Sequence, residues 1–385
     1  MGKRSARWSR RGVLKAGAAG VALTPLASSM VWPSAGDDIY TGKCVVTLQL
    51  DGGADVTQLC DPKINIPGEP KINNWADVSE PGQAGNISFA PVADNEWMFN
   101  RFGADMLVIN GVDAQTNSHE TGRLYNWTGS NAVGKPSITA LHSAHTAPDG
   151  PLAYSVFGGT SRTCGIIGYN LFNEIRSLRT LSQPRLSSRG PQSAPDHLLK
   201  RAQTEYDLID SLANSEIERF LARDKITARQ LDSLNRFQLA RQKRQGLAVL
   251  ADLLPSDSDI PSRTNFETAG WKWSSNLKEQ MQGALLIFKS GLGSGADISF
   301  SGFDSHDDND EIQEQLYFHF ADALGFFWEY ATELGIEDRI LLIIGSDFGR
   351  TNFYNDGNGK DHWPVGSYII MESNAPWGNR VAGLT

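Results

Sequence analysis

Short apolar runs that end abruptly in polar residues recur along the chain. Such runs are typical of buried strands in a parallel sheet. Between them lie longer segments with apolar residues at the 3.6-residue spacing of amphipathic helices. This alternation predicts an α/β fold, with strands at Cys44–Leu50, Met106–Asn110, Ala296–Phe300, Ile340–Ile344 and Tyr368–Met371, and helices at Asn276–Leu292 and Glu311–Leu334.

Residues 196–254 have a different pattern, in which charged residues alternate with leucine, isoleucine and phenylalanine. The spacing predicts two amphipathic helices separated by a break near residues 223–227. We interpret this segment as a helical insertion in an α/β domain that runs from residue 40 to residue 385. The pattern is compatible with a solvated helical hairpin that has no function of its own. It is also compatible with a pair of helices that serves as a lid or as a surface for a partner.

The first 35 residues have the composition of an export signal. Five basic residues at positions 3–11 form a charged first segment, and the apolar stretch that follows, Ala16–Ala27, is too short for a membrane span. The segment Ser9–Lys15 (SRRGVLK) resembles the twin-arginine export signature. We therefore expect a signal peptide at residues 1–35, the twin-arginine translocase as a partner during export, a periplasmic or extracellular location, and no permanent membrane span.

Composition narrows the possible functions further. The formal net charge of −9 disfavours nucleic-acid binding, which needs a basic surface. The three cysteines do not have a metal-ligand spacing such as C-x-x-C. Any metal site should therefore be built from imidazoles and carboxylates.

Candidate ligands follow the predicted strands. Because parallel strands deliver their carboxyl ends to one edge of a sheet, we expect these side chains to converge in one pocket. Imidazole and carboxylate ligands are compatible with zinc, manganese, calcium or magnesium. Repulsion and burial should raise the carboxylate pKa values, and Arg350, pointing into the same pocket, should partly offset this. The predicted metal ligands are Asp51, His119, Asp304, His306, Asp347 and His362.

Ser118 lies at the expected start of a helix, directly before His119. A hydroxyl at this position can cap the helix. The same position would also stabilise the alkoxide of a nucleophile. The sequence leaves both roles open for Ser118.

Five motifs occur in an order that resembles the exported domain-of-unknown-function 1501 family: LDGG, SHETG, GFDSHDDN, GSDFGRT and GKDHWP. That family looks like a branch of the alkaline phosphatase/sulfatase superfamily. The resemblance implies a three-layer α/β sandwich with a central, mostly parallel sheet and two divalent ions at its carboxyl edge. By resemblance, Asp304, His306 and His362 hold one ion, and Asp51 and Asp347 hold the other. Ser118 lies nearest the nucleophile position, and Arg350 takes the place of the substrate-binding arginine.

These features predict an exported, metal-dependent hydrolase of phosphate or sulfate esters, acting on a small anionic ester or a glycan. The alternative is a non-catalytic protein of the same fold that binds a metal, a glycan or a partner at the cell envelope. Two departures from the superfamily pattern motivate the alternative: Phe348 follows Asp347 where a histidine is usual, and the nucleophile signatures of phosphatases and sulfatases are absent.

Overall fold

The computed structural model describes residues 39–383, except positions 133, 160, 184–200, 224–225, 228, 232, 235–245 and 269–270. The predicted signal peptide lies outside the described residues, as does part of the predicted helical insertion. Among the described residues, no helix is long and apolar enough to cross a bilayer.

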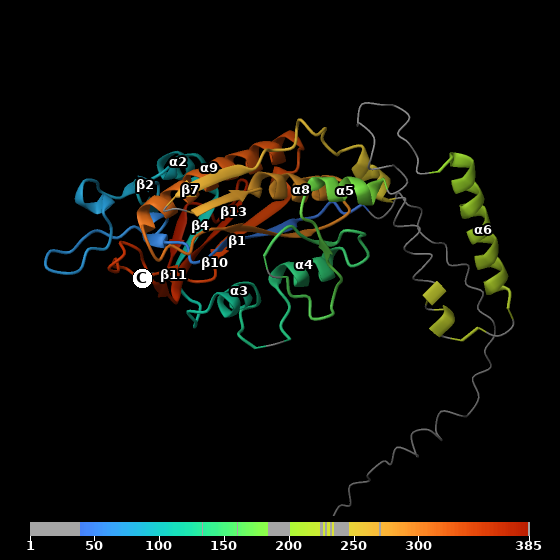
Figure 1. The fold of residues 1–385 in the computed structure, drawn as a ribbon, viewed down its shortest axis with the longest axis horizontal. Helices are drawn as coiled ribbons and strands as arrows, with labels where there is room; N and C mark the ends of the chain where they lie inside the picture. Colours follow the sequence, from blue (N-terminus) through green and yellow to red (C-terminus); the bar gives the residue numbers. More distant parts are fainter. Residues whose placement is uncertain are drawn as a thin grey trace, which may run out of the picture. The chain divides into compact units, whose positions relative to one another are not determined.

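Within the described residues, eight strands form one central sheet in the order β14-β4-β13-β10-β1-β9-β5-β6. Strands β4, β13, β10 and β1 of this sheet are labelled in Figure 1. Strand β1 pairs in parallel with both β10 and β9, and β5 pairs in parallel with β9 and β6. The strands are β1 (Cys44–Asp51), β4 (Met106–Asp113), β5 (Tyr154–Val156), β6 (Asn170–Leu171), β9 (Gly295–Ser301), β10 (Ile340–Ser346), β13 (Val365–Glu372) and β14 (Arg380–Ala382).

Strand β13 runs antiparallel to both of its neighbours, β10 and β4. Strands β1, β4, β9 and β10 therefore point the same way, and their carboxyl ends share one edge with the amino end of β13. The apolar run at Tyr368–Met371 predicted this strand but not its direction. The reversal matters because the residues just before β13 reach the same edge as the ends of the parallel strands.

Helices cover both faces of the sheet. In Figure 1, α2 (Asn95–Phe102), α5 (Ile175–Ser182), α8 (Leu277–Lys289) and α9 (Asn309–Glu333) lie on one side, and α3 (His119–Thr128) and α4 (Ile138–Thr146) on the other. This arrangement is the predicted α/β sandwich with a central, mostly parallel sheet.

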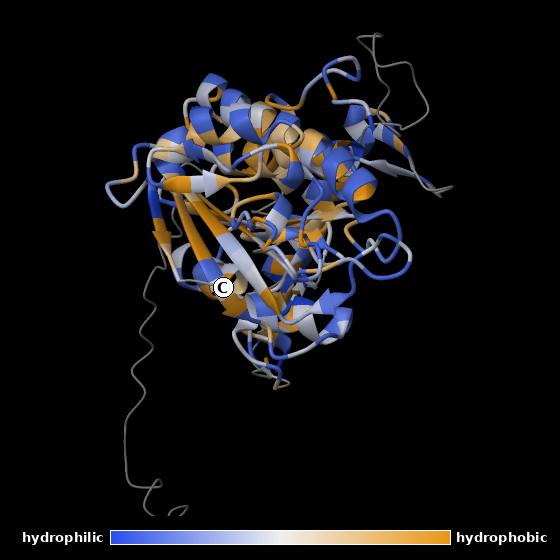
Figure 2. Ribbon diagram, turned by 90° about the vertical axis from the view of Figure 1, so that its left-hand side faces the viewer, coloured by the Kyte–Doolittle hydropathy of each residue, from blue (hydrophilic) through white to orange (hydrophobic). Residues whose placement is uncertain are grey.

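The alternation of side chains along β1 explains the two covered faces. Cys44, Val46, Leu48 and Leu50 belong to the main apolar core, which includes α8 and α9. Val45 belongs instead to a small cluster with Trp127 of α3. Successive strand side chains point to opposite faces, so both faces of a central strand must be covered. Figure 2 shows the resulting distribution, with apolar strands inside and polar outer faces on the helices.

Helix α9, together with α8, contributes many side chains to one layer of the core. Its apolar positions recur at helical spacing, and each fully buried side chain of this size contributes about 1.5–3 kcal/mol. The fully buried apolar side chains on this face are Leu316, Phe320, Leu324 and Phe327. The helix fixes the position of the loop that precedes it, which carries Asp304 and His306.

The described part of the predicted insertion includes α6 (Gln203–Leu221), which has no buried residue. Its end at Leu221 lies close to the predicted break at residues 223–227. Three antiparallel hairpins complete the described structure: β2 (Gly82–Ala84) with β3 (Ile87–Phe89), β7 (Thr264–Thr268) with β8 (Trp271–Ser275), and β11 (Gly349–Arg350) with β12 (His362–Trp363).

Candidate metal centre

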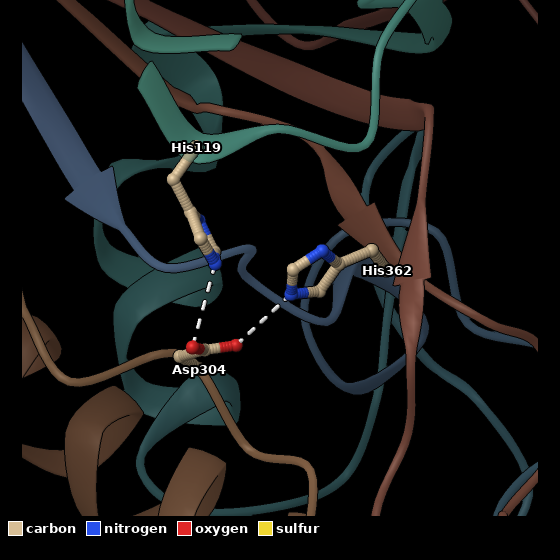
Figure 3. A group of neighbouring side chains, drawn as sticks. All are labelled: His119, Asp304 and His362. Carbon is tan, nitrogen blue, oxygen red and sulfur yellow. Dashed lines mark hydrogen bonds and ion pairs between the residues drawn. The ribbon is translucent and has the colours of Figure 1, made fainter. Parts of the chain in front are cut away.

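Three histidines converge on one aspartate at the carboxyl edge of the sheet. His119 comes from the first turn of α3, Asp304 and His306 follow β9, and His362 lies in β12, just before β13. His119 Nε2 is 3.4 Å from Asp304 Oδ2, whereas His306 Nε2 and His362 Nε2 lie 3.1 and 3.2 Å from Asp304 Oδ1. Figure 3 shows His119 and His362 directed at the two oxygens of Asp304. We call these four residues the imidazole–carboxylate cluster.

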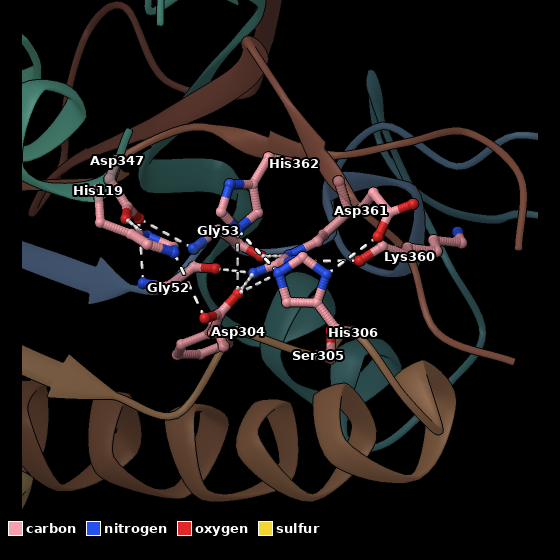
Figure 4. A network of polar contacts seen from close by, with 12 residues as sticks. Gly52, Gly53, His119, Asp304, Ser305, His306, Asp347, Lys360, Asp361 and His362 are labelled. Atoms are coloured by element: carbon pink, nitrogen blue, oxygen red, sulfur yellow. Dashed lines mark hydrogen bonds and ion pairs between the residues drawn. The ribbon is translucent and has the colours of Figure 1, made fainter. Parts of the chain in front are cut away.

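The other ring nitrogen of each histidine is held by an acceptor outside the cluster. His119 Nδ1 lies 2.5 Å from Asp347 Oδ2, and His306 Nδ1 lies 3.0 Å from Asp361 Oδ1 (Figure 4). His362 Nδ1 lies 2.8 Å from the backbone oxygen of Asn117. Carboxylate and carbonyl oxygens only accept hydrogen bonds, so each Nδ1 carries the proton. In the neutral imidazoles, each Nε2 then presents a lone pair to the cluster.

These lone pairs oppose one another unless a cation lies among them. His306 Nε2 and His362 Nε2 are 2.9 Å apart, and both face the same oxygen of Asp304. Nε2 of His119 is a buried atom without a hydrogen-bond partner among the described residues. His119, Asp304 and His362 each offer one ligand atom, and these three atoms lie within 4.8 Å of one another. Histidines whose second nitrogen is fixed by a carboxylate or carbonyl are typical of metal sites, and the residues present fit a divalent ion.

In the metal-free cluster, a proton on His119 supplies positive charge next to the carboxylates. The carboxylate of Asp304, 3.4 Å from Nε2, and then that of Asp347 raise the pKa of His119 to about 9. Burial raises the pKa of the Asp304 carboxyl, but His119 and Arg350 more than offset this and hold it below its ordinary value. His306 lowers the pKa of Asp361 by hydrogen bonding. The sequence-based expectation of raised carboxylate pKa values is therefore wrong for Asp304, because this carboxyl faces cationic and hydrogen-bonding partners.

The free energy of unfolding of the metal-free protein should fall as the pH rises towards about 9. His119 holds its proton more tightly in the folded state, with a pKa of about 9 against its ordinary 6.5. This stabilisation is fully present below pH 6.5 and is lost as the pH rises through about 9. Denaturation midpoints measured across this range with a chelator present test the effect. In His119→Gln the decrease in the free energy of unfolding between pH 6.5 and about 9 should disappear. Identical pH profiles of the denaturation midpoint for the two proteins would contradict the raised pKa of His119.

Asp347 is fully buried and its oxygens are already occupied. Its Oδ1 accepts hydrogen bonds from the backbone N–H groups of Gly52 and Gly53, at 3.0 and 2.9 Å, and from the Ser346 hydroxyl. Its Oδ2 holds His119. The structure thus places Asp347, a predicted metal ligand, behind a histidine of the cluster, where it fixes the orientation of that ring.

Two glycines permit this close packing. Gly52 has a φ of +119°, and a Cβ there would lie 2.5 Å from the backbone nitrogen of Asp304. At Gly122, in α3, a Cβ would lie 2.4 Å from the backbone oxygen of Asp347. Only glycine allows a left-handed φ at the first site without strain and a close helix approach at the second. Gly122 therefore lets α3 bring His119 against the end of β10.

Asp51 pairs with a residue that the sequence analysis did not select. Arg123 Nε lies 2.5 Å from Asp51 Oδ1, although without the alignment of a hydrogen bond. Burial, followed by the nearby charge of Asp347, raises the pKa of Asp51. This agrees with the expectation for buried neighbouring carboxylates. The sequence spacing could have identified Arg123 as a neighbour of the site, because it lies four residues after His119 and therefore on the same face of a helix.

Arg350 lies beneath the cluster rather than at its surface. Its side chain is 0 % exposed. It donates to the backbone oxygens of Gly52, Gly53 and Lys360 and, at 2.6 Å, to Asp304 Oδ1. The predicted neutralisation of the site by Arg350 is thus directed at Asp304. A contact between Arg350 and the substrate stays a prediction. In the structure, Arg350 holds the carboxylate of Asp304 in position.

Ser118 is the N-cap residue of α3, but its side chain does not cap the helix. The residue is exposed, and its backbone N–H donates to the Thr116 hydroxyl. Among the described residues, the Ser118 hydroxyl has no hydrogen-bond partner in the cluster. Of the two roles left open by the sequence, the structure does not support side-chain capping, and the nucleophile role stays a prediction.

Phe348 forms an apolar wall of the cluster. The residue is 1 % exposed, and its ring centroid lies 4.7 Å from that of His119 and 4.5 Å from that of His362. It thus packs against two imidazoles and contributes no ligand atom. The surroundings of the two rings are partly desolvated, which strengthens electrostatic interactions within the cluster.

Comparison with known proteins supports the family resemblance for the C-terminal part. Residues 279–372 match the family described as "Protein of unknown function (DUF1501)". The match covers residues 279–372 of the 385 in the chain. This segment contains Asp304, His306, Asp347, Arg350 and His362, whereas the other parts of the site, in β1 and α3, lie outside it. No match was found among curated proteins.

Solved structures with a weak similarity to this chain include three bacterial proteins. An alkaline phosphatase from the Antarctic bacterium TAB5 is 9% identical, with 89% of this chain and 95% of that chain covered and a TM-score of 0.35. A phosphonate monoester hydrolase of Agrobacterium radiobacter is 13% identical (88% and 70% covered, TM-score 0.33). A Bacteroides thetaiotaomicron protein studied in glycosaminoglycan metabolism is 10% identical (89% and 69%, TM-score 0.39). At these values the likenesses carry no argument about activity.

Proposed function

We propose that this protein is an exported, metal-dependent hydrolase of phosphate or sulfate esters, and that the imidazole–carboxylate cluster is its metal site. The observation that carries the proposal is the convergence of three Nε2 lone pairs on Asp304, with every Nδ1 held from outside. Three oriented imidazoles and one carboxylate have no structural need to face one another in this way unless they share a cation. Export by the twin-arginine pathway rests on the Ser9–Lys15 motif.

The donor set favours zinc over calcium and magnesium. Zinc accepts imidazole and carboxylate ligands in four-coordinate sites, whereas calcium and magnesium prefer oxygen ligands. We propose one ion rather than the two implied by the family resemblance. A second ion between Asp51 and Asp347 would have to displace Arg123 from the former and the backbone and histidine donors from the latter.

When bound, a divalent ion would supply a Lewis acid that polarises the ester and neutralises developing negative charge. The protein's own residues hold the site in shape. Asp347, Asp361 and the Asn117 carbonyl fix the three rings, and Arg350 fixes Asp304 from below. Ser118, exposed directly before His119, keeps its proposed role as the nucleophile.

Turnover should require the ion. A Lewis acid contributes several kcal/mol to transition-state stabilisation, so removing it should slow hydrolysis at least about a hundredfold, at about 1.4 kcal/mol per tenfold. The test combines elemental analysis of protein purified from an export-competent host with assays on phosphomonoesters, phosphodiesters and sulfate esters, before and after chelation. One zinc per chain and chelator-sensitive turnover are expected. A metal-loaded protein that hydrolyses none of these esters would overturn the proposal.

A second candidate function is metal, glycan or partner binding without catalysis. It is favoured by the burial of Arg350, which removes the predicted substrate-binding arginine from the surface, and by the lack of contact between the Ser118 hydroxyl and the cluster. The same assays separate the candidates, because this protein would bind one ion per chain but would show no turnover.

A further inference from the structure

Two guanidinium groups pair with carboxylates at this edge of the sheet, and they differ in accessibility. Arg350 pairs with Asp304 and its side chain is 0 % exposed. Arg123 pairs with Asp51 and its side chain is 32 % exposed. An anionic substrate approaching the cluster can therefore reach Arg123 but not the side chain of Arg350.

The position of Arg123 in α3 directs it towards the cluster. It follows His119 by four residues, and side chains at this spacing share one face of a helix. Its partner Asp51 is the last residue of β1 and lies close enough to Asp347 and His119 for their charges to act on it. Arg123 thus belongs to the same helix face and the same strand ends as the metal ligands.

The nearest contact between Arg123 and Asp51 is made by Nε, which is a buried atom. The side-chain hydrogen bonds of the described residues include none from the terminal nitrogens of Arg123. The planar guanidinium presents its N–H groups as a fork, and the two terminal nitrogens can bind two oxygens of one tetrahedral anion. By comparison, the donors of Arg350 are occupied by three carbonyls and a carboxylate.

The charges around the cluster make such a residue necessary for an anionic ester. Asp51, Asp304 and Asp347 would together repel a phosphate or sulfate group. With one divalent ion shared by Asp304 and three neutral imidazoles, Arg123 is, among the described residues, the cation that pairs directly with Asp51. A cation at this position would offset the repulsion and orient the anion.

We propose that Arg123 is the residue that binds the phosphoryl or sulfuryl oxygens of the substrate, held in position by Asp51. The inference rests on the proposed hydrolase function and names the group that recognises its substrate. It gives Arg123 the role that the sequence assigned to Arg350. It also gives Asp51 a positioning role for this arginine rather than a role as a metal ligand.

The test measures anion binding directly on the zinc-loaded full chain. Inorganic phosphate and sulfate are titrated by calorimetry into the wild-type protein, Arg123→Gln and Arg123→Lys. Arg123→Gln should weaken binding at least about tenfold. Arg123→Lys, which keeps the charge but loses the fork, should fall between the two. The matched control is Arg101→Gln, since Arg101 pairs with Glu329 of α9 at 3.3 Å and should not affect anion binding.

Metal content and denaturation midpoints show whether each variant is folded and loaded. Ester assays on the same proteins should give an increased KM for Arg123→Gln at unchanged zinc content. If folded, loaded Arg123→Gln keeps the wild-type anion affinity and KM while the wild type turns over esters, the role of Arg123 is overturned and the proposed function stands. If the loaded wild type neither binds these anions nor hydrolyses any ester, both proposals are overturned.

Discussion

Replacing Lys360 by methionine should lower the free energy of unfolding by about 3–5 kcal/mol, because the change leaves a buried carboxylate without its cation. Lys360 Nζ lies 2.8 Å from Asp55 Oδ2, and both side chains are 0 % exposed. The same ammonium donates to Thr57 Oγ1 and Asn73 Oδ1, at 3.1 and 3.2 Å, and lies 5.0 Å from the ring centroid of Tyr354. Methionine has a similar volume but cannot neutralise Asp55.

The effect should extend from stability to the metal site. Lys360 directly precedes Asp361 and His362, and its backbone oxygen accepts a hydrogen bond from Arg350 at 3.0 Å. Figure 4 shows Lys360 beside these site residues. Loss of the buried ion pair releases the loop that delivers His362 to the cluster. A lowered zinc affinity should therefore accompany the lowered denaturation midpoint.

Lys71 provides the matched control. It pairs with Asp77, and both side chains are 47 % exposed. A surface pair of this kind contributes about 0–1 kcal/mol, so Lys71→Met should change the free energy of unfolding by no more than that. Chemical denaturation of the three proteins, followed by tryptophan fluorescence, gives the comparison. Equal losses for Lys360→Met and Lys71→Met would show that the buried pair does not stabilise the fold.

Replacing Asp304 by asparagine should reduce zinc affinity by more than the roughly 10- to 100-fold typical of losing an outer partner of a metal ligand. Asp304 carries the negative charge that all three imidazoles of the cluster share. Asparagine preserves its shape but removes that charge. It also leaves the buried guanidinium of Arg350 with carbonyl partners only, so a decrease in stability should accompany the loss of metal.

Asp51→Asn is the informative comparison for the number of ions. With one ion held by the imidazole–carboxylate cluster, this variant should keep one zinc per chain and near wild-type affinity. With a second ion between Asp51 and Asp347, the metal content should fall from two to one. Elemental analysis and competition titration with a zinc-binding dye distinguish these outcomes. Unchanged zinc binding in Asp304→Asn would overturn the assignment of the cluster as the metal site.

Much of the fold was predictable because its signals are local. The apolar runs ending in Asp51 and Asp347 predicted buried strands, and the structure has β1 and β10 at these positions. Helical periodicity predicted α8 and α9 to within a few residues. The convergence of His119, Asp304 and His306 followed from the general rule that parallel strands end at a common edge. That of His362 followed from the expectation that the loop after Ile340–Ile344 returns to the same edge. The spacing of Arg123 from His119 was equally visible, but its partner was not.

Only the tertiary structure determined which partner each polar group of the site binds. The sequence determined the α/β class, the strand ends and the residue types of the candidate site, because hydrophobic period and turn chemistry act between near neighbours. It did not determine that Gly52 and Gly53 would donate to Asp347, nearly 300 residues away. Nor did it show that Arg350 would be buried beneath Asp304 while Arg123 stays accessible. Burial and hydrogen-bond saturation depend on which distant segments meet, so tertiary packing alone separates a candidate metal ligand from the residue that would orient it.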